Sequence, residues 1–264
     1  MNRPELQYSH VAGVRCAWVA AGEGRPLVLL HGWGASLELM WPLAERIASS
    51  GFRVFSPDFP GFGNSERPHR PWSLRDYSNF VLEFLKLHEL DHVDLAGHSF
   101  GGRVCLMLGA DHPERMGKML LFNAAGLRPR QSLSSRARLK AYQFARSSLE
   151  RIGLSMASDR LAHRYQRRFA SPDYRAADGV MRPTFVRIVN EDMRPFAARV
   201  RPPTLLFWGD QDEETPLWMG MELENLIPDA GLIVWEGAGH YSYLDRLADT
   251  ARVALHFLQE ESPQ

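Results

Sequence analysis

Short apolar runs alternate with stretches of helical periodicity along most of the chain. The run Pro26–Leu30 is wholly apolar, which is typical of a strand buried on both faces of a parallel sheet. From Ser73 to Leu90, apolar residues recur mostly at helical spacing, and Ser73 is a favourable N-cap. Further strands are predicted at Val14–Ala20, Arg53–Asp58, Val93–Ala96, Lys118–Phe122, Thr204–Trp208 and Leu232–Trp235, and further helices at Leu37–Ser49, Arg103–Ala110, Pro216–Leu226 and Leu247–Gln259. This alternation predicts an α/β fold whose mainly parallel, twisted sheet carries helices on both faces.

The pattern changes in the middle of the chain. Helical patterns cover Ser132–Ile152 and Arg182–Val189, with no confident strand between them. We predict a helical lid at residues 127–201, inserted into a core formed by residues 1–126 and 202–264. This lid carries 17 Arg and Lys residues against 6 Asp and Glu residues. We expect these basic side chains to face solvent; the alternative is that some line the pocket and favour carboxylate-bearing esters.

Length and composition are those of an ordinary globular protein. The chain has 264 residues, of which 45% are hydrophobic and 23% charged, and this suits one large α/β domain with or without an insertion. A formal net charge of zero points to neither a nucleic-acid nor a membrane partner. The N-terminus lacks the apolar core of a signal peptide, and no apolar run is long enough to span a membrane. We therefore expect a cytoplasmic protein, with its oligomeric state left open.

Several kinds of site find no support in the sequence. Cys16 and Cys105 lie far apart and outside any CxxC or Cys/His cluster, and we expect Cys105 to be a buried packing residue. There is no Walker A sequence and no HExxH motif. The segment Gly61-Phe62-Gly63 lacks the third glycine of a dinucleotide-binding loop. We expect neither a metal nor a cofactor.

The segment Gly97-His98-Ser99-Phe100-Gly101 matches G-x-S-x-G and lies between a predicted strand and a predicted helix. A nucleophile elbow requires this context, because a strained turn holds the serine hydroxyl clear of the sheet. Gly97 and Gly101, followed by Gly102, supply the small residues that such a turn needs. The alternative is a glycine-rich turn without chemistry, but the flanking strand and helix favour Ser99 as a nucleophile.

A second glycine-rich segment, His31-Gly32-Trp33-Gly34, follows the strand Pro26–Leu30. In isolation it is a common turn after a buried strand. Its position upstream of Ser99 is where the second donor of an oxyanion hole is expected. We predict that the backbone N–H groups of Trp33 and Phe100 form this hole. His31 itself is expected to be structural, with its imidazole bound to loop carbonyls.

Two further loops carry a candidate acid and a candidate base. Gly209-Asp210-Gln211-Asp212 and Gly237-Ala238-Gly239-His240 each follow a predicted strand. Ligands of open α/β sheets bind at the carboxyl ends of the strands, where Ser99 is also placed. Either loop alone is equally consistent with an ordinary solvated turn, but the three together predict a Ser-His-Asp constellation with His240 as the base.

These pieces resemble the α/β-hydrolase superfamily from near Pro26 to the end of the chain. The matching segments are LLHGWG, DFPGFGNS, GHSFGG, WGDQDEETP and GAGH. The resemblance implies the α/β-hydrolase fold, a lid before the strand Thr204–Trp208 and no cofactor. The chain order Ser…Asp…His also agrees with this superfamily.

The resemblance further selects the acid. The similar families show the pattern G-x-x-D-x-x-x-P, which this chain meets with Asp212 as the acid and Pro216 at the start of the next helix. Asp210 is then expected to serve mainly the hydrogen bonds of its own loop. Glu213 and Glu214 fall outside the pattern and are expected to face water.

The nucleophile and its neighbours sort the subfamilies. Haloalkane dehalogenases and epoxide hydrolases use aspartate at the elbow, so Ser99 disfavours both. Hydrolases that cleave carbon–carbon bonds in meta-fission products usually show Asn before the serine and Trp after the histidine, whereas this chain has His98 and Tyr241. The motifs are more similar to those of carboxylesterases.

We therefore expect a serine hydrolase that cleaves small to medium carboxylic esters through an acyl-enzyme. The same three residues also serve C–C hydrolases, lactonases, thioesterases and cofactor-free perhydrolases. A small-molecule receptor with weak hydrolysis is the alternative from another functional class.

Overall fold

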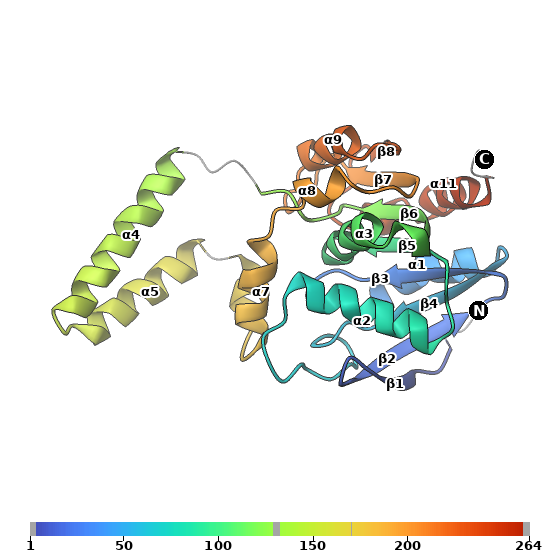
Figure 1. Ribbon diagram of the computed structural model, residues 1–264. Coiled ribbons are helices and arrows are strands. Elements are labelled where there is room, and N and C mark those ends of the chain that lie inside the picture. Colours follow the sequence, from blue (N-terminus) through green and yellow to red (C-terminus); the bar gives the residue numbers. More distant parts are fainter. Residues whose placement is uncertain (1–3, 129–132, 170, 261–264) are drawn as a thin grey trace.

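A single eight-stranded sheet, covered by helices on both faces, forms the body of the protein (Figure 1). The computed structural model describes residues 4–128, 133–169 and 171–260. The strand order is β1-β2-β4-β3-β5-β6-β7-β8; β1 and β2 pair in antiparallel fashion, as do β2 and β4, and every other neighbouring pair is parallel. The strands are β1 (Gln7–Val11), β2 (Val14–Ala21), β3 (Arg25–Leu30), β4 (Phe52–Pro57), β5 (Val93–His98), β6 (Met116–Phe122), β7 (Thr204–Gly209) and β8 (Ala230–Trp235). The predicted α/β class and mainly parallel sheet are confirmed.

The sheet divides the hydrophobic core into two parts. Successive side chains of a strand point to opposite faces. In β3 this sends Val28 and Leu30 to one part of the core and Leu27 and Leu29 to the other, and all four are fully buried. Strands β3 to β8 all run parallel to one another, and only β4 also pairs with the antiparallel β2. The carboxyl ends of β3 to β8 therefore meet at one edge of the sheet. The loops of the candidate site leave from this edge.

Helices cover each part of the core. Their bounds are α1 (Leu37–Ala48), α2 (Leu74–Leu87), α3 (Phe100–Asp111), α9 (Leu217–Leu226), α10 (Ser242–Asp245) and α11 (Leu247–Gln259), with a short 3-10 turn η1 (Pro113–Arg115). The apolar residues of α1 and α11 join the part that contains Leu27, and those of α2 and α3 join the part that contains Val28. Ser73 caps α2 as predicted, because its hydroxyl accepts a hydrogen bond from Asp76 N–H and the Asp76 carboxylate accepts one from Ser73 N–H.

Between β6 and β7 the described chain forms five helices: α4 (Leu133–Arg151), α5 (Ser155–Phe169), α6 (Pro172–Ala176), α7 (Met181–Val189) and α8 (Arg194–Ala197). Figure 1 shows α4 and α5 packed as a hairpin that projects away from the sheet, whereas α7 and α8 lie against the body. Helices α5, α6 and α8 were not predicted. Helix α5 is rich in arginine and poor in apolar residues, and α6 and α8 are only 5 and 4 residues long. Few apolar positions in the first case, and short length in the other two, leave little hydrophobic pattern from which to predict a helix.

Three local features also differ from the predictions. Strand β1 was missed because it is a mostly exposed edge strand without a clear alternation of buried positions. The short helix α10 was also missed. Helix α3 begins at Phe100, three residues earlier than predicted, because only Ser99 separates it from β5. None of the described helices is long and apolar enough to cross a membrane.

Candidate active site

Ser99 occupies a strained turn between β5 and α3. Its backbone has φ 49° and ψ −107°, a conformation that L-residues rarely adopt. The two glycines of the motif permit this turn because a side chain would not fit. A Cβ atom on Gly97 would lie 2.6 Å from Gly101 C, and a Cβ atom on Gly101 would lie 2.1 Å from Leu30 O. The predicted strand–turn–helix context of Ser99 is therefore present.

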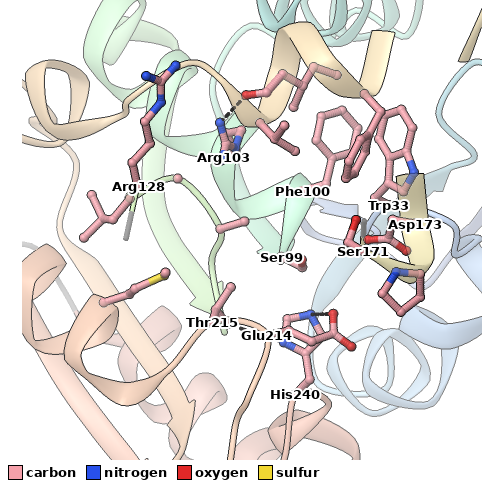
Figure 2. Close-up of a pocket in the computed structure, with 18 of the residues that line it drawn as sticks. Trp33, Ser99, Phe100, Arg103, Arg128, Ser171, Asp173, Glu214, Thr215 and His240 are labelled. Atoms are coloured by element: carbon pink, nitrogen blue, oxygen red, sulfur yellow. Dashed lines mark hydrogen bonds and ion pairs between the residues drawn. The ribbon is translucent and has the colours of Figure 1, made fainter. Parts of the chain in front are cut away.

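A cavity of about 480 Å³ opens beside Ser99 (Figure 2). His240 lines the same cavity, and its apolar wall includes Trp33, Phe100 and Phe185. The indole of Trp33 packs edge-on against the Phe100 ring at 5.6 Å and tilted against the Phe185 ring at 5.1 Å, measured between centroids. Because Phe185 belongs to α7, the chain between β6 and β7 supplies part of this wall.

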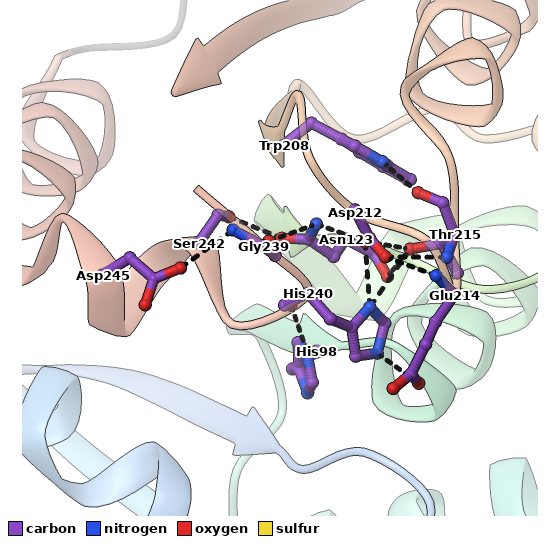
Figure 3. A network of polar contacts seen from close by, with 10 residues as sticks. All are labelled: His98, Asn123, Trp208, Asp212, Glu214, Thr215, Gly239, His240, Ser242 and Asp245. Carbon is purple, nitrogen blue, oxygen red and sulfur yellow. Dashed lines mark hydrogen bonds and ion pairs between the residues drawn. The ribbon is translucent and has the colours of Figure 1, made fainter. Parts of the chain in front are cut away.

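His240 is hydrogen-bonded to Asp212, as Figure 3 shows. The distance from His240 Nδ1 to Asp212 Oδ2 is 2.9 Å. The Asp212 carboxylate also accepts hydrogen bonds from Glu214 N–H at 2.8 Å and from Thr215 N–H at 2.9 Å. Burial acts to raise the pKa of Asp212, but hydrogen bonds from His240 and Thr215 outweigh it and lower the pKa to about 2. The carboxylate is thus ionised at neutral pH and orients the imidazole.

Asn123 is a site residue that the sequence reasoning missed. It is fully buried, and its Nδ2 donates to Asp212 Oδ2 at 2.6 Å. Its Oδ1 accepts a hydrogen bond from Ser242 Oγ, which fixes the orientation of the amide. Asn123 directly follows β6 and has a φ of 45°, which asparagine tolerates better than most residues. The available signal was its position at the carboxyl end of a central strand.

Asp210 does not contact the histidine side chain. Its Oδ1 accepts a hydrogen bond from Gly237 N–H at 2.8 Å. We expected Asp210 to serve its own loop, but the bond instead joins the loop after β7 to the loop after β8, which carries His240. The reason is that β7 and β8 are neighbours in the sheet, and sequence spacing alone does not show this.

Glu214 contacts the other ring nitrogen of His240. The Oε2 atom of Glu214 lies 3.4 Å from His240 Nε2. Glu213 and Glu214 are both exposed, as predicted, and both also line the cavity. The contact of the Glu214 side chain, which is 66% exposed, with His240 was not predicted. Within the described part of the chain, no hydrogen bond joins Ser99 Oγ to His240. Where a serine and a histidine act together in catalysis, this hydrogen bond is often long in the free protein and shortens only when substrate binds.

The two backbone N–H groups predicted to form an oxyanion hole belong to residues that line the same cavity as Ser99. Phe100 is the first residue of α3, so its N–H has no acceptor within the helix. Trp33 N–H also has no acceptor among the residues that the structure describes.

His31 supports the Trp33 turn, because its Nδ1 donates to Gly32 O at 2.7 Å and its Nε2 accepts from Phe59 N–H at 2.9 Å. His31 therefore binds one loop carbonyl, as expected, and one N–H, which was not expected.

The cysteines and the other potential metal ligands form no site. Cys16 and Cys105 are free and fully buried, as expected for Cys105, and burial raises the pKa of both thiols. No cluster of three or more His, Cys, Asp or Glu side chains able to hold a metal ion occurs in the described ranges.

A family model described as alpha/beta hydrolase fold matches residues 25–247, which is most of the chain. The chain belongs to the α/β-hydrolase fold family. The strained serine turn, the glycine-rich loop after β3 and the acid and histidine loops at the carboxyl edge are all within or beside this match. The family resemblance stated from the sequence motifs is confirmed.

The proteins that this chain is similar to carry names of several different activities. The chain is 28% identical to 2-hydroxymuconate semialdehyde hydrolase from Pseudomonas sp. strain CF600, over 98% of this chain and 96% of the relative. The crystal structure of the enol-lactonase from Burkholderia xenovorans LB400 has a TM-score of 0.74 at 23% identity, covering 96% of this chain and 100% of the other. An esterase from Exiguobacterium antarcticum has a TM-score of 0.74 at 20% identity, covering 96% and 99%. At these identities the two solved structures share the fold.

Proposed function

We propose that this protein is a serine hydrolase that cleaves carboxylic esters of small to medium acyl compounds through an acyl-enzyme. The observation that carries the proposal is the ionised Asp212 carboxylate bound to His240, with His240 on the same cavity as the strained Ser99. The hydrogen bond from His240 Nδ1 leaves Nε2 as the atom available to accept a proton. The chain between β6 and β7, which contributes Phe185 to the cavity, acts as its lid.

The first half of the reaction transfers the acyl group to Ser99. Its Oγ attacks the ester carbonyl while His240 Nε2 takes the hydroxyl proton, and Asp212 stabilises the imidazolium. The new oxyanion is held by the N–H groups of Trp33 and Phe100, and by the N-terminus of α3. When the tetrahedral intermediate collapses, the bond to the alcohol oxygen breaks and His240 protonates the leaving alkoxide.

The second half returns the enzyme to its starting state. Water attacks the acyl carbonyl as His240 removes one of its protons. The bond from carbonyl carbon to Ser99 Oγ then breaks, and His240 gives the proton back to Oγ. The products are a carboxylic acid and an alcohol, and no cofactor takes part.

Covalent labelling tests this proposal directly. We expect a fluorophosphonate probe to label the wild-type protein at Ser99 and to leave Ser99→Ala unlabelled. A series of 4-nitrophenyl esters of increasing chain length should be hydrolysed by the wild type, and kcat should fall by roughly 10³-fold or more in Ser99→Ala. Equal labelling of the two proteins would refute the assignment of the nucleophile.

Carbon–carbon bond hydrolysis is a second candidate, favoured by the similarity to 2-hydroxymuconate semialdehyde hydrolase over 98% of the chain. His98 and Tyr241, the two residues that disfavoured this activity in the sequence, contact the histidine loop and each other. His98 Nε2 donates to the carbonyl oxygen of His240, and the Tyr241 ring lies 4.9 Å from the His98 ring. Incubation with 2-hydroxymuconate semialdehyde, followed by its absorbance, distinguishes the two candidates, because an ester hydrolase of this kind leaves the compound intact.

A further inference from the structure

The charged side chains of the cavity are divided between two groups. Arg103 and Arg128 both line the cavity and lie together (Figure 2). The charge of Arg128 acts on Arg103, as do the opposite charges of Glu191 and Asp192, which lie outside the cavity lining. The second group consists of Glu213, Glu214 and Asp173, and Glu214 contacts His240. Burial, followed by the charge of Glu214, raises the pKa of Asp173. A substrate in this cavity therefore meets positive charge on one side and negative charge beside His240.

Arg103 is a buried cation with unused donors. The residue is 6% exposed, and its Nη1 donates to the carbonyl oxygens of Ile188 and Glu191. In the described part of the chain, Nε and Nη2 of Arg103 have no acceptor, and no carboxylate lies within the 4.0 Å of an ion pair. Burial lowers the pKa of Arg103 to about 10, which still leaves it charged at neutral pH. The charges of Glu191 and Asp192 act on Arg103 to raise its pKa, but in the described ranges neither carboxylate forms an ion pair with the guanidinium. A buried guanidinium with N–H groups left without acceptors is still costly, and an anion bound from the cavity relieves that cost.

The position of Arg103 in α3 sets where this anion lies. Arg103 follows Ser99 by four residues, which is one helical turn or about 6 Å along the axis. A guanidinium at that spacing reaches a carboxylate a few bonds away from the carbonyl that Ser99 attacks. Arg128 is the one residue of the basic segment 127–201 that brings a positive charge to the cavity within the described residues, and it adds to the same side.

The acidic side chains beside His240 determine which half of an ester substrate can carry the negative charge. The leaving oxygen must approach His240 Nε2 to be protonated, and this atom faces Glu214. The alcohol half of an ester therefore lies among Glu213, Glu214 and Asp173, where a second negative charge would be repelled. The acyl half extends from Ser99 in the other direction, towards Arg103.

We propose that Arg103, assisted by Arg128, is a carboxylate-binding subsite for the acyl half, and that the enzyme selects half-esters of short dicarboxylic acids whose alcohol is uncharged. This inference rests on the proposed ester hydrolysis. Atoms balance as in the mechanism above: attack by Ser99 releases the neutral alcohol, and water then releases the dicarboxylate. The carboxylate held by Arg103 is not altered in either step.

Two matched ester pairs test the subsite. The first is 4-nitrophenyl hydrogen glutarate against 4-nitrophenyl methyl glutarate, in which the charge lies on the acyl half. The second is 4-acetoxybenzoate against methyl 4-acetoxybenzoate, in which the charge lies on the alcohol half. We expect kcat/KM to favour the anion of the first pair by about 10- to 100-fold, as for a charge-assisted hydrogen bond. In the second pair the neutral ester should be the better substrate.

Variants then assign the effect to Arg103. In Arg103→Met the preference within the first pair should fall to about threefold or less. The matched control is Arg187→Met, because Arg187 is exposed, donates to Pro71 O and does not line the cavity, so its preference should equal that of the wild type. In Glu214→Gln, the disadvantage of 4-acetoxybenzoate should shrink while the first preference persists. If Arg103→Met fails to fold, Arg128→Met and the wild-type pairs decide instead.

The possible results distinguish failure of the proposed carboxylate subsite from failure of the proposed ester hydrolysis. Hydrolysis of both glutarate esters at equal kcat/KM overturns the subsite and leaves ester hydrolysis intact. A preference that survives in folded Arg103→Met overturns the role of Arg103. Failure of every ester to react, together with absence of fluorophosphonate labelling, refutes the proposed function itself.

Discussion

The Nε2 atom of His98 lies 3.0 Å from the carbonyl oxygen of His240, so the residue before the candidate nucleophile holds the backbone of the candidate base. Since a carbonyl only accepts, this nitrogen carries the proton. Burial, followed by the charge of His240, lowers the pKa of His98 to about 3, so that it remains a neutral donor. Its Nδ1 has no partner among the described residues and faces Gly32, in the loop that carries Trp33.

This contact predicts that His98 is a positioning residue. We expect His98→Ala to lower kcat for a 4-nitrophenyl ester by about tenfold or more with little change in KM, because the histidine loop loses its tether. His98→Gln keeps an N–H donor and should recover part of kcat. Steady-state kinetics of the two variants, with their thermal midpoints as a check on folding, test this. Equal losses in both would assign His98 to packing alone.

Asp212 and Asp210 should differ sharply in their effect on catalysis. Asp212→Asn removes the charge that orients His240, and we expect it to lose about 10⁴-fold in kcat, as in a well-studied serine protease. Asp210→Asn removes only the acceptor for Gly237 N–H and should lose less than about tenfold. Both variants should stay folded. The reverse order of losses would make Asp210 the catalytic acid, against the geometry.

Asp212 should also make stability depend on acid pH. Its pKa is about 2 in the folded protein against an ordinary value of 3.8 for aspartate, so the native state binds fewer protons than the unfolded state between these values. The stabilisation is present above pH 3.8 and is lost as the pH falls through about 2; it amounts to roughly 2 kcal/mol. Urea unfolding of wild type and Asp212→Asn across this window should show the two free energies converging as the pH falls.

Gly101 should tolerate no side chain. A Cβ atom there would lie 2.1 Å from Leu30 O and 2.9 Å from His31 O, and both are backbone atoms of a buried segment. We expect Gly101→Ala to destabilise the fold by roughly 3 kcal/mol or more. Gly231→Ala is the matched control, because its Cβ would meet only the end of the Leu205 side chain at an ordinary 3.5 Å. Chemical denaturation of both variants measures the difference.

The sequence determined the parts of this protein that depend on short-range patterns. The run Pro26–Leu30 predicted β3 because a strand buried on both faces must be continuously apolar. The turn at Ser99 was predicted from five consecutive residues, since its geometry depends on neighbouring glycines. The resemblance of one loop to the family pattern G-x-x-D-x-x-x-P also distinguished Asp212 from Asp210 as the residue that contacts His240, because that loop contains both the acid and the proline of the pattern.

Only the tertiary structure decided which distant side chains surround the site. Asn123 reaches Asp212 across 89 residues, and Glu214 reaches His240 because β7 and β8 are neighbours. Arg103 is a buried cation only because the carbonyls of α7 and the following turn close over it. Each of these contacts depends on the packing of separate elements, and the energy of a buried charge or amide depends on everything that excludes water around it. A local sequence pattern does not show which residues will surround a given side chain in the folded protein.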